Sequence, residues 1–132
     1  MKMIRGYWGS LLKVTVMFLV MAILAPLPAV AEEPIQVKSL EQLESEYRER
    51  PRDHEVNYEY CGKLIEVKDY SKAIEVCTIA IETGTENTLS WSYLDRGVAY
   101  KELGKLEDAK SDRELSKQHG MPKWLLDSYL KL

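Results

Sequence analysis

From residue 39 to the end of the chain, apolar residues recur at intervals of three and four, which is the period of an α-helix. Capping residues, glycines and prolines divide this stretch into segments. These segments predict helices at 39–50, about 54–67, about 70–83, about 88–103, about 106–119 and 122–131. No window shows the alternating, β-branched pattern of a strand strongly enough to compete. We therefore expect an all-α fold.

The predicted helices differ in the amount of apolar surface that they carry. The helix at about 70–83 is apolar around most of its circumference, and such a helix is expected at the centre of a bundle. The helix at about 106–119 is mostly polar, with Leu106, Ala109 and Leu115 as nearly its only apolar residues. We expect this second helix on the outside.

Small residues in two consecutive helix pairs follow the same spacing. Cys61, Ala73 and Ala80 are 12 and 7 residues apart, and a second set repeats this spacing 36 residues later. The second set is Gly97, Ala109 and Ser116. A period of this length is typical of helix pairs that stack on one another to complete a core. The sequence therefore predicts a helical-repeat scaffold, a kind of protein that acts by binding.

The region from His54 to about Met121 resembles tetratricopeptide repeats (TPR), whose helix pairs place small residues at three fixed positions. The two sets of small residues fill these positions, and the segment from Asp95 to Gly104 is the strongest local match. The resemblance implies a short TPR-like solenoid of helical hairpins. Its expected parts are an N-terminal helix within 39–52, two helix pairs (54–87 and 90–121) within 53–121, and a C-terminal capping helix within 122–132.

Two features depart from the family pattern. A large apolar residue of the second helix is replaced by Cys77 in the first unit and by Arg113 in the second, which predicts a looser second unit. Two units are also fewer than the three or more that such stacks normally need. We expect the flanking helices, or a second copy of the chain, to cover the ends.

The first 31 residues have the composition of an export signal. Basic residues precede an apolar run over 11–30, which ends in small residues and then becomes acidic, as in a secretory signal peptide cleaved after Ala31. An uncleaved membrane anchor is the alternative, because the run approaches the roughly 20 residues of a spanning helix. Pro26 and Pro28 argue against a continuous helix. The expected segments are a signal peptide at 1–31 and a linker at 32–38.

The charge balance changes once the signal peptide is removed. All 21 acidic residues but only 15 of the 18 basic residues lie after Ala31, so the mature chain has a net charge of −6. Nucleic acid and anionic membranes both attract clustered positive charge. We therefore expect a periplasmic or secreted protein that binds no nucleic acid and touches a membrane only if its N-terminal segment stays uncleaved.

Cys61 and Cys77 are the two cysteines, and Asp69, in a predicted turn, lies midway between them. In an antiparallel helix hairpin, residues equally far from the turn face each other at the same height. Export delivers a protein to an oxidising compartment, where two thiols within reach of each other normally form a disulfide. We expect a disulfide, which would stabilise the domain by roughly 3 kcal/mol. Two buried, reduced cysteines that pack as small apolar residues are the alternative.

Residues that carry chemistry are sparse. His54 and His119 are isolated, with no second histidine or cysteine at metal-ligand spacing. The carboxylates lie on polar helix faces with lysines nearby, and the chain has neither a glycine-rich phosphate loop nor a serine elbow. We therefore expect no enzyme, no catalytic residue, no metal site and no cofactor.

The family resemblance implies a partner-binding groove on the first helices of the two units. Its expected lining is mostly apolar with two aromatic anchors, and consists of Tyr58, Ile65, Trp91, Leu94, Val98 and Lys101. The clamp residues with which chaperone-binding members hold a terminal carboxylate are absent. Two occupants remain open, a hydrophobic segment of a partner or the C-terminal helix, folded back with Trp124 and Leu125 in the groove.

The expected function is that of an exported, TPR-like interaction module of the cell envelope that binds a protein or peptide. One alternative is a structural or accessory subunit of a larger envelope complex, or a homodimer, that docks through Val76 and Ile79. The sequence also leaves open a small hydrolase or redox factor, and a membrane-anchored form.

Overall fold

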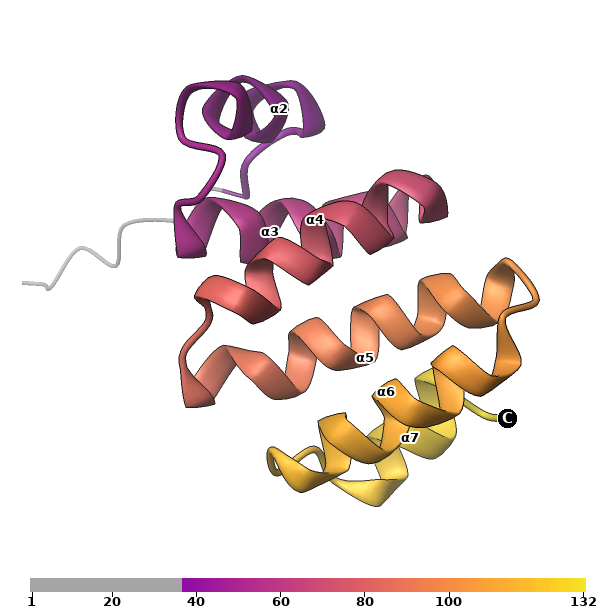
Figure 1. The fold of residues 1–132 in the computed structure, drawn as a ribbon. Helices are drawn as coiled ribbons and strands as arrows, with labels where there is room; N and C mark the ends of the chain where they lie inside the picture. The colour runs from indigo at the N-terminus through magenta and orange to yellow at the C-terminus, as the bar shows by residue number, and fades with distance from the viewer. Residues whose placement is uncertain (1–36) are drawn as a thin grey trace, which may run out of the picture. The chain divides into compact units, whose positions relative to one another are not determined.

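The computed structural model describes residues 37–132, and every regular element in this part of the chain is an α-helix. In chain order the helices are α2 (Leu40–Glu49), α3 (His54–Glu66), α4 (Tyr70–Thr83), α5 (Glu86–Glu102), α6 (Leu106–Gln118) and α7 (Lys123–Tyr129) (Figure 1). The expected all-α fold is confirmed for these residues. The expected signal peptide and most of the expected linker lie outside the described residues. None of the described helices has both the length and the apolar character that crossing a bilayer requires.

Side chains at the helix ends explain why the helices begin where they do. The Ser39 hydroxyl accepts a hydrogen bond from Gln42 N at 3.2 Å, and the Gln42 side chain accepts one from Ser39 N at 2.8 Å. This reciprocal capping box starts α2. Asp53 caps α3 by accepting a hydrogen bond from Val56 N at 3.1 Å.

The turns inside the two helix pairs have the same backbone conformation. Lys68 follows α3 and Gly104, 36 residues later, follows α5, with φ angles of 63° and 74°. Glycine adopts this left-handed conformation freely, whereas a lysine is strained there. The next residue closes each turn through a backbone hydrogen bond, at 3.0 Å in the first pair and 2.8 Å in the second. The 36-residue repeat of the sequence is therefore also a repeat of conformation.

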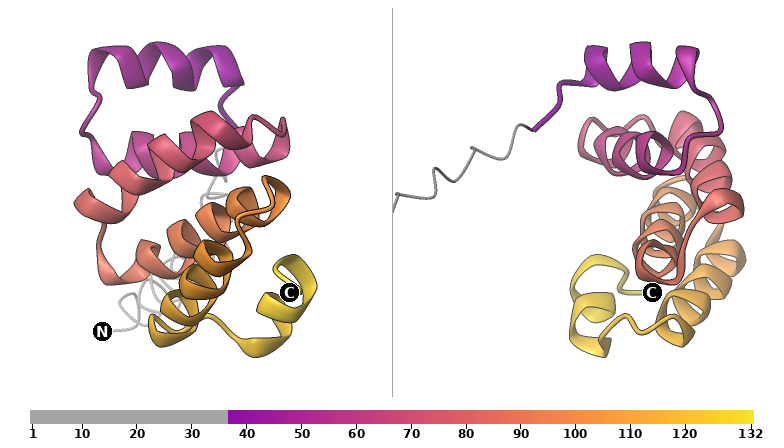
Figure 2. Two further views of the ribbon diagram at one scale, coloured as in Figure 1. Left: turned by 45° about the vertical axis from the view of Figure 1, so that its right-hand side comes forward. Right: turned by 90° about the vertical axis from the view of Figure 1, so that its left-hand side faces the viewer.

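The order of packing along the chain is regular. Helices α3 and α4 form one pair, α5 and α6 form the next, and α2 packs on α3. Helix α3 also contacts α5, and α5 contacts α7, whereas α4 and α6 do not contact each other. Figure 2 shows that α3 and α5 lie on one side of the stack and α4 and α6 on the other.

Two clusters of buried side chains form the core of residues 37–132. The first joins α2, α3 and α4 and also takes in Ala99 of α5. The second joins α5, α6 and α7 through Leu94, Ala109, Met121, Leu126 and Leu130. Val76 of α4 is 0% exposed, because α4 packs against both α3 and α5. The alternative in which Val76 docks on another subunit is therefore wrong.

Helix α7 turns Leu126 and Leu130 toward α5 and α6, and both are fully buried. These two residues are one helical turn apart and therefore share a face. Trp124 is 70% exposed and Tyr129 is 60% exposed. The C-terminal helix thus folds back on the second helix pair, where Leu125 packs against the same cluster as Leu94 and Val98, while Trp124 stays exposed.

Candidate functional site

One surface of α3 and α5 combines partly exposed aromatic, small and acidic residues, and we call it the α3–α5 face. It consists of Tyr58, Gly62, Ile65, Trp91 and Asp95. The three α3 residues follow each other at intervals of four and three, and Trp91 lies one turn before Asp95, so each set shares one side of its helix. The two helices meet closely here, since a Cβ atom built on Gly62 would lie 3.6 Å from Asp95 Oδ2.

The structure leaves only part of the predicted groove lining available to a partner. The predicted residues that keep some exposure are Tyr58, Ile65, Trp91, Val98 and Lys101. Leu94 is 1% exposed and belongs to the second core cluster. Its assignment to the groove is wrong, because Leu126 and Leu130 of α7 pack in the same cluster.

Asp95 is the residue of this face that the sequence did not reveal. Its carboxyl is largely shielded from solvent although the residue as a whole is partly exposed, and this burial, together with the charge of Glu66, raises its pKa to about 7. Asp95 Oδ2 lies 3.9 Å from Cys61 Sγ, which has no proton to donate because it is part of a disulfide. The available sequence signal was its position one turn after Trp91, on the expected groove side.

The other carboxylates beside this face have cationic partners. Glu59 pairs with Lys38 at 2.9 Å, and this contact contributes to raising the pKa of Lys38. Glu66 pairs with Lys63 at 2.6 Å. Within residues 37–132, no basic side chain pairs with Asp95, and the charge that acts most on it is the negative one of Glu66. Asp95 is thus an acidic group without a counter-ion in the part of the chain that the structure describes.

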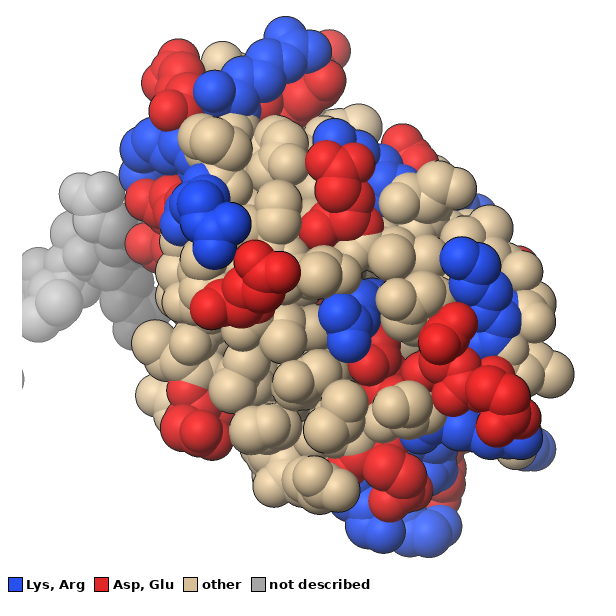
Figure 3. All heavy atoms as spheres, viewed as in Figure 1, with Lys and Arg blue, Asp and Glu red and all other residues tan. Residues whose placement is uncertain are grey.

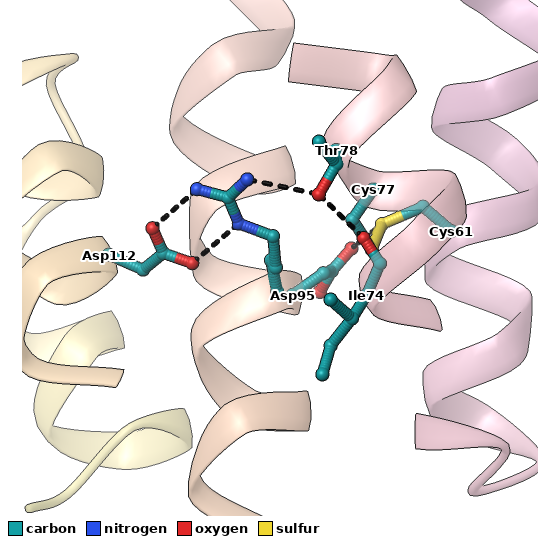
Figure 4. Close-up of a disulfide and its surroundings, with 7 residues drawn as sticks. Cys61, Ile74, Cys77, Thr78, Asp95 and Asp112 are labelled. Carbon is teal, nitrogen blue, oxygen red and sulfur yellow. Dashed lines mark hydrogen bonds and ion pairs between the residues drawn. A yellow bond between two sulfur atoms is a disulfide. The ribbon is translucent and has the colours of Figure 1, made fainter. Parts of the chain in front are cut away.

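Cys61 and Cys77 join α3 to α4 directly behind Asp95 (Figure 4). Their sulfur atoms lie 2.04 Å apart, as expected for the predicted disulfide, and both residues are 0% exposed. Thiol–disulfide exchange needs an attacking thiolate to reach a sulfur atom. In this fold the disulfide therefore acts as a structural cross-link of the first helix pair.

A second polar cluster lies inside the α5–α6 pair and was not predicted. Arg96 Nε and Nη2 donate hydrogen bonds to the two Asp112 oxygens, both at 2.8 Å, and Nη1 donates to Thr78 Oγ1 at 3.1 Å (Figure 4). Burial opposes the charge on Arg96, yet the Asp112 hydrogen bonds keep its pKa above the usual value. Asp112 is 2% exposed. The charges of Arg96 and Asp112 compensate each other, and their hydrogen bonds connect α4, α5 and α6. This cluster is therefore structural.

Helix α7 is held in place by Gly97 and Arg113, which occupy the positions of the second pair that are equivalent to the two cysteines of the first. Gly97 lies 36 residues after Cys61, and Arg113 lies 36 residues after Cys77. Arg113 Nε donates a hydrogen bond to Leu130 O at 3.1 Å. A Cβ atom on Gly97 would come within 2.6 Å of Leu130 Cδ2, so the glycine leaves room for that side chain. The predicted looseness at Arg113 is therefore wrong, because Arg113 binds α7.

The remaining polar residues do not assemble a site in the described region. His54 Nε2 lies 3.1 Å from Thr88 Oγ1, and His119 Nδ1 lies 3.2 Å from Glu86 Oε2. No group of three metal-ligating side chains occurs within residues 37–132. On the face seen in Figure 3, acidic and basic residues are interspersed, and exposed pairs of this kind contribute little energy.

Comparisons with protein-family models, with curated proteins and with solved structures find no match to this chain. The chemistry of the α3–α5 face follows from its own residues. Tyr58 and Trp91 offer aromatic surface, and Asp95 offers a carboxylate that accepts hydrogen bonds.

Proposed function

We propose that this protein is a repeat scaffold of the tetratricopeptide type that acts by binding a segment of another protein on its α3–α5 face. The observation that carries the proposal is that all the small residues of the repeated spacing are buried. They are Cys61, Ala73, Ala80, Gly97, Ala109 and Ser116. Buried small residues at equivalent positions support the same kind of assembly in both helix pairs, which is the basis of a stacking repeat.

The packing order supports the same interpretation. The first helices of the two pairs, α3 and α5, contact each other, while the second helices, α4 and α6, do not. A row of first helices is the surface on which the family resemblance places the binding groove. The turns at Lys68 and Gly104 repeat as well.

The exposed aromatic residues favour this face as the binding surface. Trp91 is 39% exposed, and Tyr58 one helix away is partly exposed. Tyrosine and tryptophan are frequent among the residues that dominate binding energies, because they bury a large area at a small cost in conformational entropy.

Export is part of the proposal. The sequence of residues 1–31 favours a cleaved signal peptide, and the Cys61–Cys77 pair is of the kind that persists in oxidising compartments. We propose a mature domain that resides in the periplasm or outside the cell and functions by binding alone.

A second candidate function is a structural one, and the outer side of α7 favours it. Trp124 and Tyr129 are 70% and 60% exposed. Exposed aromatic residues at the end of a stack are suited to contact a second copy or a larger envelope complex.

A pull-down from envelope extract compares the two surfaces. The wild-type protein is immobilised beside a Tyr58→Ala/Trp91→Ala variant and a matched Trp124→Ala/Tyr129→Ala variant. We expect the first variant to lose the captured protein and the second to retain it, since the anchors lie on the α3–α5 face. Thermal denaturation of each variant checks that the fold is intact. Loss only in the α7 variant would favour the structural function, and identical capture by all three would remove the α3–α5 face as the binding surface.

A further inference from the structure

We infer that Asp95 is the binding site for a lysine or arginine side chain carried by the partner segment, an inference that rests on the proposed function of the α3–α5 face. The features that support it are Asp95 itself, the missing side chain at Gly62, and the residues that flank Gly62 on α3.

Asp95 keeps partial exposure, and on the side of α3 Gly62 places no side chain over its carboxyl. Among the described residues, the one atom within 4 Å of a Cβ built on Gly62 is Asp95 Oδ2, at 3.6 Å. Tyr58 and Glu66 lie one turn before and one turn after Gly62 on the same side of α3. Both act electrostatically with Asp95, so they lie near its carboxyl.

The partly buried carboxyl of Asp95 has no cationic partner among residues 37–132. A carboxylate removed from water is unfavourable unless a cation or several hydrogen-bond donors compensate it. No basic side chain of residues 37–132 pairs with Asp95, and its polar contact in this region is a disulfide sulfur that cannot donate. Burial and the negative charge of Glu66 raise its pKa to about 7. Glu59, a neighbouring carboxylate, differs from Asp95 because it forms an ion pair with Lys38 at 2.9 Å.

An incoming ammonium or guanidinium group would satisfy several residues of the face at once. It would donate hydrogen bonds to Asp95 and lie near the negative charge of Glu66. Tyr58 and Trp91 are placed to contact the aliphatic part or the charge of the same side chain. The acidic balance of residues 32–132, with a net charge of −6, attracts cationic segments at longer range.

The test uses short synthetic peptides that alternate Leu with Arg, and counterparts in which Gln replaces Arg. Binding to the mature protein is measured by calorimetry, and the Asp95 carboxyl is followed by carbon NMR during a pH titration. We expect the Leu/Arg peptide to bind about tenfold tighter than the Leu/Gln peptide, the effect of a charge-assisted hydrogen bond. We also expect it to lower the pKa of Asp95 from about 7.

Three variants separate a local site from general charge attraction. Asp95→Asn is expected to lose the preference for the Leu/Arg peptide, whereas Asp108→Asn, the same change at an exposed position of α6, is expected to keep it. Gly62→Arg places a guanidinium of the chain itself beside Asp95. This variant should have a lowered Asp95 pKa before any peptide is added, and it should no longer prefer the Leu/Arg peptide. Gly62→Met fills the same space without a charge and should leave the Asp95 pKa unlowered.

Equal affinity for both peptides, absence of binding, or equal losses in Asp95→Asn and Asp108→Asn would overturn the inference. If both peptides bind equally and the Tyr58→Ala/Trp91→Ala variant loses them, the proposed function stands and only the cation site is rejected. If the pull-down is also unaffected by that variant, the proposed function fails together with the inference.

Discussion

The raised pKa of Asp95 sets the direction in which this residue changes the stability of the free domain with pH. The pKa of this carboxyl is about 7 in the folded protein, against an ordinary value of 3.8. The folded protein therefore holds the proton more tightly than the unfolded chain, and the stability associated with it is lost as pH rises from about 4 to about 7. A residue with this cost is expected where function requires it.

Replacing Asp95 by Asn removes the titration, so Asp95→Asn should stabilise the free protein at pH 8. We expect a gain in the free energy of unfolding on the order of 1–4 kcal/mol at pH 8 and little gain near pH 4. Urea denaturation at both pH values measures it. Asp108→Asn serves as the control because Asp108 is exposed on α6. A gain of the same size at both pH values would contradict the burial of this carboxyl.

Periodicity could place Trp91 and Asp95 on one side of α5, but it could not reveal that Asp95 is shielded. Shielding depends on how closely α3 approaches, and that approach depends on Gly62 and on the cross-link at Cys61. Leu94 shows the opposite case. Its burial depends on α7, a helix more than twenty-five residues later in the chain.

At the scale of the elements, the docking of α7 depends on the absence of a side chain at one position of α5. Gly97→Ala would bring a Cβ atom to 2.6 Å from Leu130 Cδ2 and to 3.3 Å from Asp112 Cβ. We expect a net destabilisation of roughly 1–3 kcal/mol despite the higher helix propensity of alanine. The free energy of unfolding from denaturant titration, with Trp124 fluorescence as a probe of α7, measures the effect.

Gly62→Ala is the matched control for this substitution, on the neighbouring helix. A Cβ atom at Gly62 meets only Asp95 Oδ2 at 3.6 Å, an ordinary contact. Alanine should therefore stabilise α3 by roughly 0.5–1 kcal/mol. A stabilising Gly97→Ala would show that Leu130 has space to move and that the docking of α7 is less close than its contacts indicate.

The starts of α2 and α3 were predictable because local interactions fix them, whereas α5 begins at Glu86, two residues before the predicted start. Ser39 and Asp53 cap their helices through residues three positions later, and such contacts can be recognised in the sequence. The inward face of α7 was not predictable in this way. A helix of seven residues carries too few periods to decide between Trp124 and Leu126, and its partner Arg113 does not resemble a docking residue in isolation.

At the scale of the whole described region, equivalent positions stabilise the two helix pairs by different means. In the first pair, Cys61 and Cys77 form a covalent bond between α3 and α4. In the second pair, the corresponding Gly97 and Arg113 accept Leu130 of α7. The first pair thus carries a covalent cross-link in addition to its packing against α2 and α5, whereas the second pair packs against α7 and binds it through Arg113.

Removal of the disulfide should therefore weaken the whole fold. The cysteines are 16 residues apart, and a cross-link that closes a loop of this size stabilises a protein by about 3 kcal/mol. We expect Cys61→Ala/Cys77→Ala to lose about this amount in urea denaturation. Alanine is the suitable replacement because both positions are fully buried and a serine hydroxyl would need a partner.

Wild type and variant are each unfolded with and without dithiothreitol. The reductant should lower the midpoint of the wild type to that of the variant and leave the variant unchanged, because a cross-link acts chiefly by restricting the unfolded chain. A midpoint of the wild type that does not respond, with two free thiols found by mass spectrometry of the exported protein, would show that the cysteines are reduced and that apolar packing alone holds the first pair.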